Sequence, residues 1–509
     1  MKQPINAKLI DSADAPAGAK EIRAVFIGLM IVLGLGAIDQ SIVATALPRI
    51  ASDLGGVSRL TWIVTSYVLA STGVIPLYGK LSDQYGRKSM LFIAVVTFLV
   101  GSALCGAAHS LTQLIIFRAV QGLGAGGLLP LSQTIIADLV PPKERGKRQG
   151  SISAVFAVCS VVGPVLGGLI TDLLSWHWIF YVNLPIGAVA LVVIEKALRR
   201  PHRARQQRID YLGAALLTAA TTAFLLILTL GGIQWAWSSA QIGLLCAATL
   251  ALGIWFILHI HRVPEPVLPL DLFRNRLFVL ASIVLGFTFM GLLGASIFFP
   301  LFFQVVMGVS PAHSGLLTVP LMVGVLISSI ANGRLLLRTG RYKPAQIGGL
   351  SLAVTAFAAL SWGAATSRGF GFIEPCIFGL GLGLGFVMPN MTVAVQNTLS
   401  VAHRGVGTAT LAFFRSLGGL IGVTGSGAIL ASQLHLASGT SVGSLPELGM
   451  RQLAALAPEA QMAAIAVYRH AITLNFVCGV CIVAVALFTL LFLPEYPLRA
   501  DTGTSAAQE

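Results

Sequence analysis

Long apolar runs recur along this chain, and they constrain its fold more than any other feature. A transmembrane helix needs about 20 consecutive, mostly apolar residues to cross the hydrocarbon core of a bilayer. Because backbone groups in a bilayer must find hydrogen bonds within the protein, each such run is predicted to be an α-helix. We identify fourteen runs, and the chain is therefore predicted to be an all-α integral membrane protein with fourteen transmembrane helices. The runs are 24–47, 60–80, 89–108, 111–139, 150–171, 179–198, 211–231, 240–261, 277–306, 313–337, 344–366, 370–399, 405–432 and 468–493.

The charged residues are few, and their distribution excludes a nucleic-acid-binding protein. They make up 10% of the chain, whereas soluble domains are about 25% charged. The net charge of +14 reflects 33 Lys and Arg against 19 Asp and Glu residues. Of the 33 basic residues, 26 lie in the tails and in one set of alternate loops, 5 lie in the other loops and 2 lie within helices. This is the positive-inside pattern, so we expect no nucleic-acid partner. The even number of helices puts both termini on the same side of the membrane, and the basic loops on that side predict that it is the cytoplasm. We expect the protein to lie in the cytoplasmic (inner) membrane of a bacterium.

Identical residues recur at one fixed offset between the two halves of the chain, which indicates an internal repeat. They are Gly122, Gly124, Gly126, Pro130, Arg145, Gly146, Gly163 and Gly168, matched by Gly381, Gly383, Gly385, Pro389, Arg404, Gly405, Gly422 and Gly427. We therefore predict two six-helix repeat bundles that flank an inserted helix pair, with a substrate site between the bundles near the bilayer midplane. The predicted domains are an N-terminal tail (1–23), a first bundle (24–198), the inserted pair with basic linkers (199–276), a second bundle (277–493) and a C-terminal tail (494–509).

A short charged segment, Gly79-Lys-Leu-Ser-Asp-Gln-Tyr-Gly-Arg-Lys88, joins the second and third apolar runs. Its first residue and Gly86 permit close helix approach and a backbone turn with positive φ. Asp83 and Arg87 are four positions apart, within reach of each other or of a neighbouring helix end. A partial copy, Gly333–Arg341, lies in the second half of the chain. The segment is therefore a hinge that marks the repeat, and its basic residues also help to set the topology.

Two charged residues are predicted to lie deep in the membrane at equal depth. Asp39 and Arg118 each lie about 10 Å below the outer boundary, given the 1.5 Å rise per residue of an α-helix. A charge at this depth costs several kcal/mol unless it is paired or hydrated, so mutual pairing or a shared aqueous cavity is expected. Arg118 would favour the charged carboxylate, and desolvation would oppose it. The pair is a candidate for proton coupling, and the alternative is a structural salt bridge between two helices.

Several stretches identify the family that this chain resembles: Ile38-Asp-Gln-Ser-Ile-Val-Ala-Thr-Ala-Leu-Pro48, Trp62-Ile-Val-Thr-Ser-Tyr67, the hinge, Arg118-Ala-Val-Gln-Gly-Leu-Gly124, Gly163-Pro-Val-Leu-Gly-Gly168 and Trp176-His-Trp-Ile-Phe-Tyr-Val-Asn-Leu-Pro185. From about residue 25 to residue 495, the chain resembles the fourteen-helix drug:proton antiporter branch of the major facilitator superfamily. The hinge is specific for the superfamily. The Gly-Pro pattern of the fifth run resembles that of exporters rather than importers.

The resemblance implies roles for three groups of residues. It implies that Asp39 and Arg118 are proton-coupling residues. It also implies that Asp83, Arg87 and Asp138 form a charge cluster that holds an inner gate shut. An antiport-specific role for Gly163, Pro164, Gly167 and Gly168 comes from the resemblance alone, whereas a bend and tight packing of this helix follow from the residue types.

Further polar residues are candidates for lining a substrate cavity. Arg415 lies in the middle of its helix and has no counterpart in the repeat, and Glu374 stands near the outer end of its own helix. Either can line the cavity, and Glu374 can equally be an interfacial residue. The uncharged candidates are Gln121, Gln304, Asn332, Asn390 and Gln396, each of which is as often a hydrogen-bonding contact between helices.

The expected function is a proton-coupled antiporter that exports lipophilic or cationic drugs by alternating access. The sequence has no Gly-x-x-x-x-Gly-Lys-Ser/Thr motif, so ATP is not expected to drive transport. The alternative is an exporter of a specific metabolite, such as an amino acid, a siderophore or a self-made antibiotic; a membrane sensor is a remote one. No enzymatic activity, cofactor or metal site is expected. The expected partners are a small-molecule substrate, protons and lipid. The protein is expected to be a monomer, with a periplasmic adaptor as an additional candidate partner.

Overall fold

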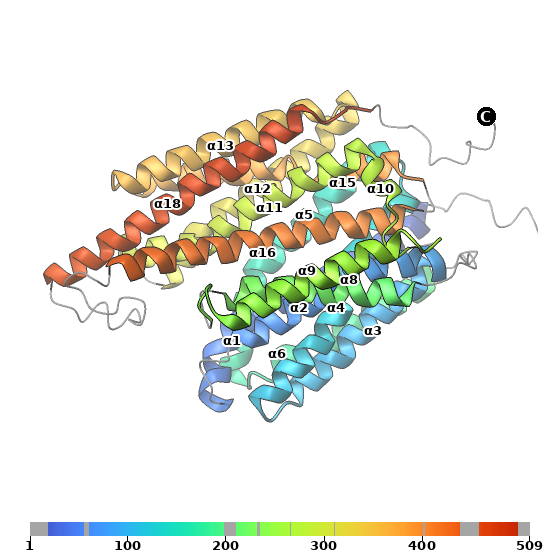
Figure 1. Ribbon diagram of the computed structural model, residues 1–509, viewed down its shortest axis with the longest axis horizontal. Coiled ribbons are helices and arrows are strands. Elements are labelled where there is room, and N and C mark those ends of the chain that lie inside the picture. Colours follow the sequence, from blue (N-terminus) through green and yellow to red (C-terminus); the bar gives the residue numbers. More distant parts are fainter. Residues whose placement is uncertain are drawn as a thin grey trace, which may run out of the picture.

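The described part of this chain consists almost entirely of long helices that lie side by side (Figure 1). A computed structural model describes residues 19–54, 61–197, 210–231, 235–264, 266–309, 311–400, 403–437 and 458–496. Its helices are α1 (Ala19–Leu54), α2 (Thr61–Tyr85), α3 (Arg87–Gly106), α4 (Leu111–Leu139), α5 (Pro142–Leu173), α6 (Trp178–Tyr181), α7 (Asn183–Ala197), α8 (Tyr211–Leu230), α9 (Ala240–Ile260), α10 (Asp271–Arg274), α11 (Arg276–Leu301), the π-helical turn η3 (Phe302–Val306), α12 (Pro311–Thr339), α13 (Lys343–Ala365), α14 (Phe370–Gly385), α15 (Met388–Thr398), α16 (Arg404–Ala437) and α18 (Pro458–Leu491).

Fourteen membrane-spanning segments are found in this part of the chain, which confirms the predicted number and the all-α fold class. Three predicted spans are interrupted. A turn separates α6 from α7, and Phe386 and Val387 separate α14 from α15, which has Pro389 in its first turn. Proline is favoured there because it has no N–H to leave unpaired. The third span changes from α11 to the π-helical turn η3 just after Pro300, where proline removes one backbone hydrogen bond.

The helices form two groups, each with its own apolar core. In the first group α1 packs on α5 and α7, and α4 packs on α2 and α3. In the second, α11 packs on α16, and α13 packs on α14 and α18. Leu29 and Phe98 belong to the first core, and Phe357 and Phe476 to the second. The helices α8 and α9 pack on each other, and α8 also contacts α2 and α16. The predicted domain boundaries remain a prediction.

The two groups meet through α5 with α12 and through α2 with α16. At two of these contacts a glycine lets the backbones approach. A Cβ on Gly79 would lie 2.9 Å from Val406 Cα, and a Cβ on Gly150 would lie 3.2 Å from the carbonyl oxygen of Ser329. Both glycines lie toward the predicted cytoplasmic end, and the groups spread apart toward the opposite end (Figure 1). The molecule is therefore held together near one end of its helices.

Two expectations about local structure need correction. The hinge is not an extended turn, because α2 continues to Tyr85 and only Gly86, with φ 94°, separates it from α3. The counterpart in the repeat, Gly340, also has a positive φ of 64°. The last span begins at Pro458 rather than at residue 468, because the apolar and alanine-rich residues after Pro458 continue the same helix. Residues 438–457 lie outside the described part.

Candidate functional site

Asp39 and Arg118 form a buried ion pair between α1 and α4. Arg118 Nη1 lies 2.7 Å from Asp39 Oδ2. Asp39 is 0% exposed, and Arg118 is 1% exposed. Ser110 caps α4 by accepting a hydrogen bond from the backbone N–H of Gln113. Arg118 follows two turns later on the face of α4 that is turned toward α1. The pairing that equal depth predicted is present in the structure.

Three neutral side chains complete the hydrogen bonds of this pair. Asp39 Oδ1 accepts hydrogen bonds from Gln121 Nε2, at 2.7 Å, and from Asn183 Nδ2, at 3.0 Å. Ser102 Oγ accepts from the same two amide groups, at 3.2 Å and 2.9 Å, and donates to the carbonyl oxygen of Phe180 at 2.8 Å. Gln121, Asn183 and Ser102 are all fully buried. Four helices thus contribute to one network, and a buried ion pair requires such satisfaction to be stable.

The guanidinium of Arg118 is enclosed by further groups of the first bundle. It lies over the ring of Tyr67, 4.1 Å from the ring centroid, and 5.9 Å from the centroid of Phe180. Its Nη1 donates to Gln121 Oε1 at 2.6 Å, and its Nε donates to the carbonyl oxygen of Ile63 at 3.3 Å. Both charges of the pair are therefore satisfied within the first bundle, without help from the second.

Glycines bring the helices of this network close together. A Cβ on Gly101 of α3 would overlap the backbone of Gln121, and a Cβ on Gly122 of α4 would overlap the backbone of Tyr67. Short side chains such as Ser102 reach the carboxylate only because α3 and α4 are in backbone contact here. Close approach through small residues is the usual way for membrane helices to pack.

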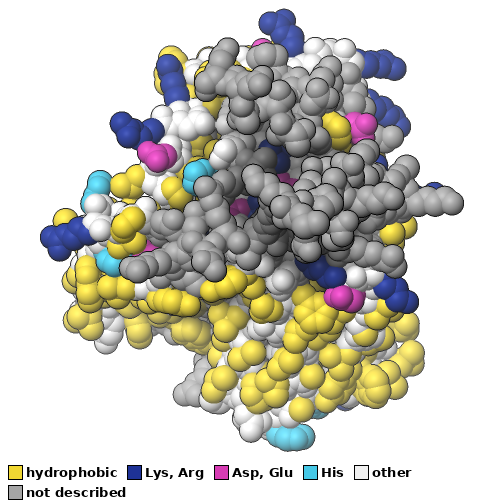
Figure 2. All heavy atoms as spheres, turned by 90° about the vertical axis from the view of Figure 1, so that its right-hand side faces the viewer, with side chains coloured by type: hydrophobic (Ala, Val, Ile, Leu, Met, Phe, Trp, Pro, Cys, Tyr) yellow, Lys and Arg dark blue, Asp and Glu magenta, His cyan; other side chains and the backbone are white. Residues whose placement is uncertain are grey.

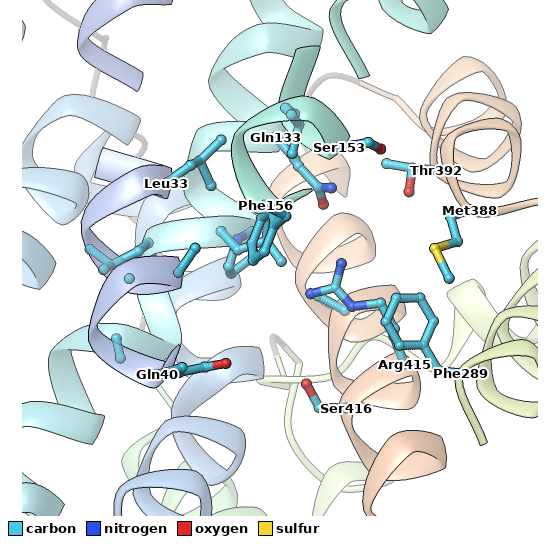
Figure 3. A pocket seen from close by; sticks show the side chains of 18 of the residues that line it. Leu33, Gln40, Gln133, Ser153, Phe156, Phe289, Met388, Thr392, Arg415 and Ser416 are labelled. Atoms are coloured by element: carbon cyan, nitrogen blue, oxygen red, sulfur yellow. The ribbon is translucent and has the colours of Figure 1, made fainter. Parts of the chain in front are cut away.

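A central cavity of about 380 Å³ lies between the two groups of helices. It is lined by α1, α2, α4 and α5 on one side and by α11, α12, α15 and α16 on the other (Figure 3). Most of the lining is apolar, and none of the described residues that form it is an Asp or Glu. The polar and aromatic residues of the lining include Gln40, Tyr67, Ser71, Gln133, Gln149, Ser153, Phe156, Ser160, Phe289, Thr392, Arg415 and Ser416.

Tyr67 separates the cavity from the buried ion pair. It lines the cavity, and its ring lies against the guanidinium of Arg118. Gln40, the neighbour of Asp39 in the chain, also lines the cavity, whereas Asp39 and Arg118 do not. The ion pair is thus one side chain away from the space that a substrate would fill.

A second charged cluster joins the two bundles at the predicted cytoplasmic end. Asp83 of α2 accepts hydrogen bonds from the first backbone N–H groups of α16, those of Gly405 at 3.0 Å and Val406 at 2.7 Å. It also pairs with Arg87. The positive end of the helix dipole and the unpaired N–H groups of a helix N-terminus stabilise a carboxylate at this position. The side chain of Asp83 therefore caps a helix of the opposite bundle.

Asp138, at the end of α4, extends this cluster. Its carboxylate lies 3.0 Å from Arg87 Nε and 2.9 Å from Arg404 Nη1, so it links α3 and α16. Arg145 lies nearby and donates to the carbonyl oxygens of Ala137, at 2.5 Å, and Val140, at 3.0 Å. Burial, and then the neighbouring Arg404, lowers the pKa of Arg145 to about 10. Lys and Arg side chains are spread over this end of the molecule (Figure 2).

The glycine motif of α5 packs this helix against α1. A Cβ on Gly163 would overlap Ser41, and a Cβ on Gly167 would lie 2.8 Å from the carbonyl oxygen of Ile42. Pro164 lies inside the helix between them. Gly168 differs from the other glycines, because a Cβ there would meet no atom within 4 Å. The packing role expected for the motif therefore applies to Gly163 and Gly167.

Six residues proposed for the cavity do not line it, which corrects that expectation: Gln121, Gln304, Asn332, Asn390, Gln396 and Glu374. Gln396 donates instead to Thr408 Oγ1 at 3.2 Å. Gln121 belongs to the buried ion-pair network. Gln304, in the π-helical turn η3, donates to Ser314 Oγ at 2.8 Å. The side chain of Asn390 is turned toward α12, where it exchanges hydrogen bonds with Asn332 at 2.8 Å and 2.9 Å. Glu374 lies near the start of α14, which packs on α12 and α13, and it does not line the cavity.

Sequence reasoning missed several residues of these two clusters. Ser102 and Asn183 are uncharged polar residues that nothing in the sequence marks as unusual. Their predicted depth in the membrane, equal to that of Asp39, is the one signal that could have identified them. Arg404 was noted as the counterpart of Arg145 in the repeat, but its pairing with Asp138 was not predicted. In the described segments, no group of three or more His, Cys, Asp or Glu residues could hold a metal ion.

Comparisons with known proteins place these features in a family. A family model described as Major Facilitator Superfamily matches residues 29–423. Multidrug transporter protein MdtP of Bacillus subtilis (strain 168) is 39% identical over 404 residues, which cover 79% of this chain and 74% of that protein. Multidrug resistance protein 3 of the same organism is 38% identical over 412 residues, covering 80% and 79%.

Two solved structures share the fold at low sequence identity. The human organic anion transporter MFSD10 (TETRAN) has a TM-score of 0.60 and 17% identity, over 90% of this chain and 99% of that one. The proton:xylose symporter XylE, bound to 6-bromo-6-deoxy-D-glucose, has a TM-score of 0.63 and 15% identity, over 94% and 97%. At these identities the similarity concerns the fold alone.

Proposed function

Because this chain belongs to the Major Facilitator Superfamily, we propose that it is a proton-coupled antiporter that exports lipophilic drugs across the cytoplasmic membrane. The observation that carries the proposal is a mostly apolar cavity formed jointly by two helix bundles, with a buried Asp–Arg pair one side chain away. The names of the relatives, a multidrug transporter and a multidrug resistance protein, support drugs as the substrate class.

Alternating access requires that the cavity open to one side at a time. In this structure the cluster of Asp83, Asp138 and Arg404 bridges the bundles at the predicted cytoplasmic end. The bundles spread apart toward the other end (Figure 1). We therefore assign this conformation to the state that is closed to the cytoplasm, in which an exporter releases its substrate. Both termini are proposed to be cytoplasmic, and the transporter to act as a monomer.

The hydrogen-bond pattern around Asp39 suggests how a proton is coupled to this motion. The carboxylate accepts bonds from Arg118, Gln121 and Asn183, and none of these groups accepts one from it. A protonated carboxyl group has an O–H that must itself donate, so the network has to rearrange. Asn183 Oδ1 is buried without a partner, and rotation of its amide would present this oxygen to the new O–H. Protonation would also free Arg118 to shift against Tyr67, which lines the cavity.

The experiment is transport by the purified protein in liposomes with an imposed pH gradient. A gradient of two pH units supports about a hundredfold substrate gradient for one-for-one exchange, because each unit is worth about 1.4 kcal/mol per proton. A lipophilic dye such as rhodamine B should accumulate in the acidic interior in response to the gradient, and a panel of amino acids and siderophores should not compete with it. Strong competition by a single metabolite would favour the alternative, a dedicated metabolite exporter.

A further inference from the structure

Arg415 is partly buried, and it differs from the fully buried arginines of this protein. It lies on α16 and lines the central cavity, and its guanidinium points into that space (Figure 3). Its aromatic contact is the ring of Phe289, 5.1 Å from the guanidinium carbon. Within the described residues, it makes no hydrogen bond or ion pair with another side chain. Arg415 is therefore a cation that faces a cavity without a counter-ion.

The rest of the lining does not neutralise this charge. The cavity is lined by no Asp or Glu, and its polar side chains are neutral amides, hydroxyls and the phenol of Tyr67. The carboxylates of the two charged clusters are already engaged: Asp39 with Arg118, and Asp138 with Arg87 and Arg404. A charge within a membrane-embedded bundle is costly unless it finds a partner. The partner that the bundle does not supply can come with the substrate.

We propose that Arg415 binds an anionic group, a carboxylate or a sulfonate, on amphipathic drugs that this protein exports. A guanidinium presents planar N–H donors in a fork that matches the two oxygens of a carboxylate. Phe289, Phe156 and Met388 surround the same space and would hold the apolar body of the drug. The proposal rests on the proposed export function and narrows its substrate class, because an acid-free cavity with one arginine disfavours purely cationic drugs.

The charge of the substrate also sets how transport responds to membrane potential. With one proton per substrate, export of a zwitterion moves one net positive charge inward, and export of a monoanion moves two. Export of a monovalent cation in exchange for a proton moves none. A substrate that uses Arg415 should therefore be exported faster when the interior is negative. The ester of a zwitterionic substrate is a cation, so its export should respond to the pH gradient alone.

The test uses two dyes that differ only in a carboxylate: rhodamine B, which carries a free carboxylate, and its ethyl ester. Binding to the full-length protein in detergent is measured by fluorescence anisotropy, and transport is measured in proteoliposomes. We expect tighter binding of rhodamine B than of the ester. Arg415→Gln should lower the ratio of the two affinities by about 10- to 100-fold, as expected for loss of a charge-assisted hydrogen bond. Arg415→Lys, which keeps the charge without the fork, should retain part of the preference.

Arg368→Gln is the matched control, because Arg368 also lies over an aromatic ring, that of Trp362 at 4.6 Å, but does not line the cavity. It should leave the affinity ratio as in the parent protein. Two outcomes would overturn the proposal for Arg415 while the export function stands. One is tighter binding of the ester than of rhodamine B, and the other is an equal loss of affinity for both dyes in Arg415→Gln. If neither dye moves in response to a pH gradient, the export function itself fails.

Discussion

The two carboxylate clusters of the first bundle differ in what they join. Among the described residues, the bonding partners of Asp39 all belong to its own bundle, and each donor around it is buried. Asp83 and Asp138 are bonded across to α16 of the second bundle, through two backbone N–H groups and Arg404. The first cluster can change its protonation without touching the interface between the bundles. The second must break whenever the bundles separate at that end.

This difference divides the proposed mechanism into two parts. The Asp39 cluster is suited to holding a proton, because a full set of short hydrogen bonds makes the charged and neutral forms structurally different. The cluster of Asp83 and Asp138 is suited to setting the balance between two arrangements of the bundles. Substitutions in the first are therefore expected to abolish coupling, and substitutions in the second to shift a conformational equilibrium. The following predictions are arranged from the largest expected effect to the smallest.

Asp39→Asn should abolish transport driven by a pH gradient, because the amide cannot take up a proton. The variant should therefore lose the whole substrate gradient that the pH gradient supports, which is about a hundredfold at two pH units. Dye accumulation in proteoliposomes measures it. The matched control is Asp210→Asn, because Asp210 also forms a buried pair, with His259 at 2.7 Å, but lies outside the cavity and the Asp39 network. Normal proton-driven transport by Asp39→Asn would remove the coupling role.

Arg118→Ala should be nearly as damaging to transport, because it leaves the buried carboxylate of Asp39 without its ionic partner. Breaking a buried pair in this way costs about 3–5 kcal/mol. Transport is therefore normalised to the amount of folded protein, measured by size-exclusion chromatography in detergent. If Arg118→Ala lowers only the amount of folded protein and the remainder transports normally, the pair is a structural salt bridge. Arg118→Lys, which keeps the charge, should fold better than Arg118→Ala.

Asp83→Ala should open the contact between α2 and α16, because the first N–H groups of α16 lose their acceptor. Loss of a helix cap typically costs about 1 kcal/mol and at most about 2, which corresponds to a five- to thirtyfold change in an equilibrium. Hydrogen exchange of the peptide that contains Gly405 and Val406 should accelerate by that factor. The hydrogen exchange of peptides from α13, which is remote from this contact, serves as the internal reference. Unchanged exchange at both amides would show that Asp83 does not hold the bundles together.

Arg404→Gln should have the smallest effect of the four. Asp138 keeps its bond to Arg87 at 3.0 Å, so only one link between the bundles is lost. The side chain of Asp138 is 27% exposed, so solvent partly screens its pair with Arg404, and we expect the pair to contribute about 1 kcal/mol, or about fivefold. The same exchange experiment should show a change smaller than that of Asp83→Ala. A larger change would move the main bridging role from Asp83 to Asp138.

Much of the architecture followed from local features of the sequence. The fourteen spans were predicted because the length and apolarity of each run are local properties. The hinge was placed correctly by its glycines, and Gly86 does adopt a positive φ. Its extent was wrong, because α2 continues to Tyr85 once its last turn is packed against the opposite bundle. The predicted start of the last span was also wrong, because its helix begins at Pro458 rather than at residue 468.

The candidate site was predicted only in part, and the successes share one reason. A charge in an apolar run is costly, so Asp39, Arg118 and Arg415 were visible in the sequence as residues that needed an explanation. Uncharged polar residues carry no such signal. The sequence did not distinguish Ser102, which bonds within the Asp39 network, from Asn390, whose amide bonds to Asn332 away from the cavity.

The sequence by itself determined how many helices this protein has, where its charges are exceptional and which halves are repeated, because hydrophobicity, charge and periodicity are properties of the chain. Only the tertiary structure decided which partner each charge has. Arg118 is enclosed by five groups of its own bundle, whereas Arg415 faces the cavity. Both are single arginines within apolar helices. Their surroundings differ because different helix faces pack against them. Those faces come from segments that are distant in the sequence, and only the packing of the helices brings them together.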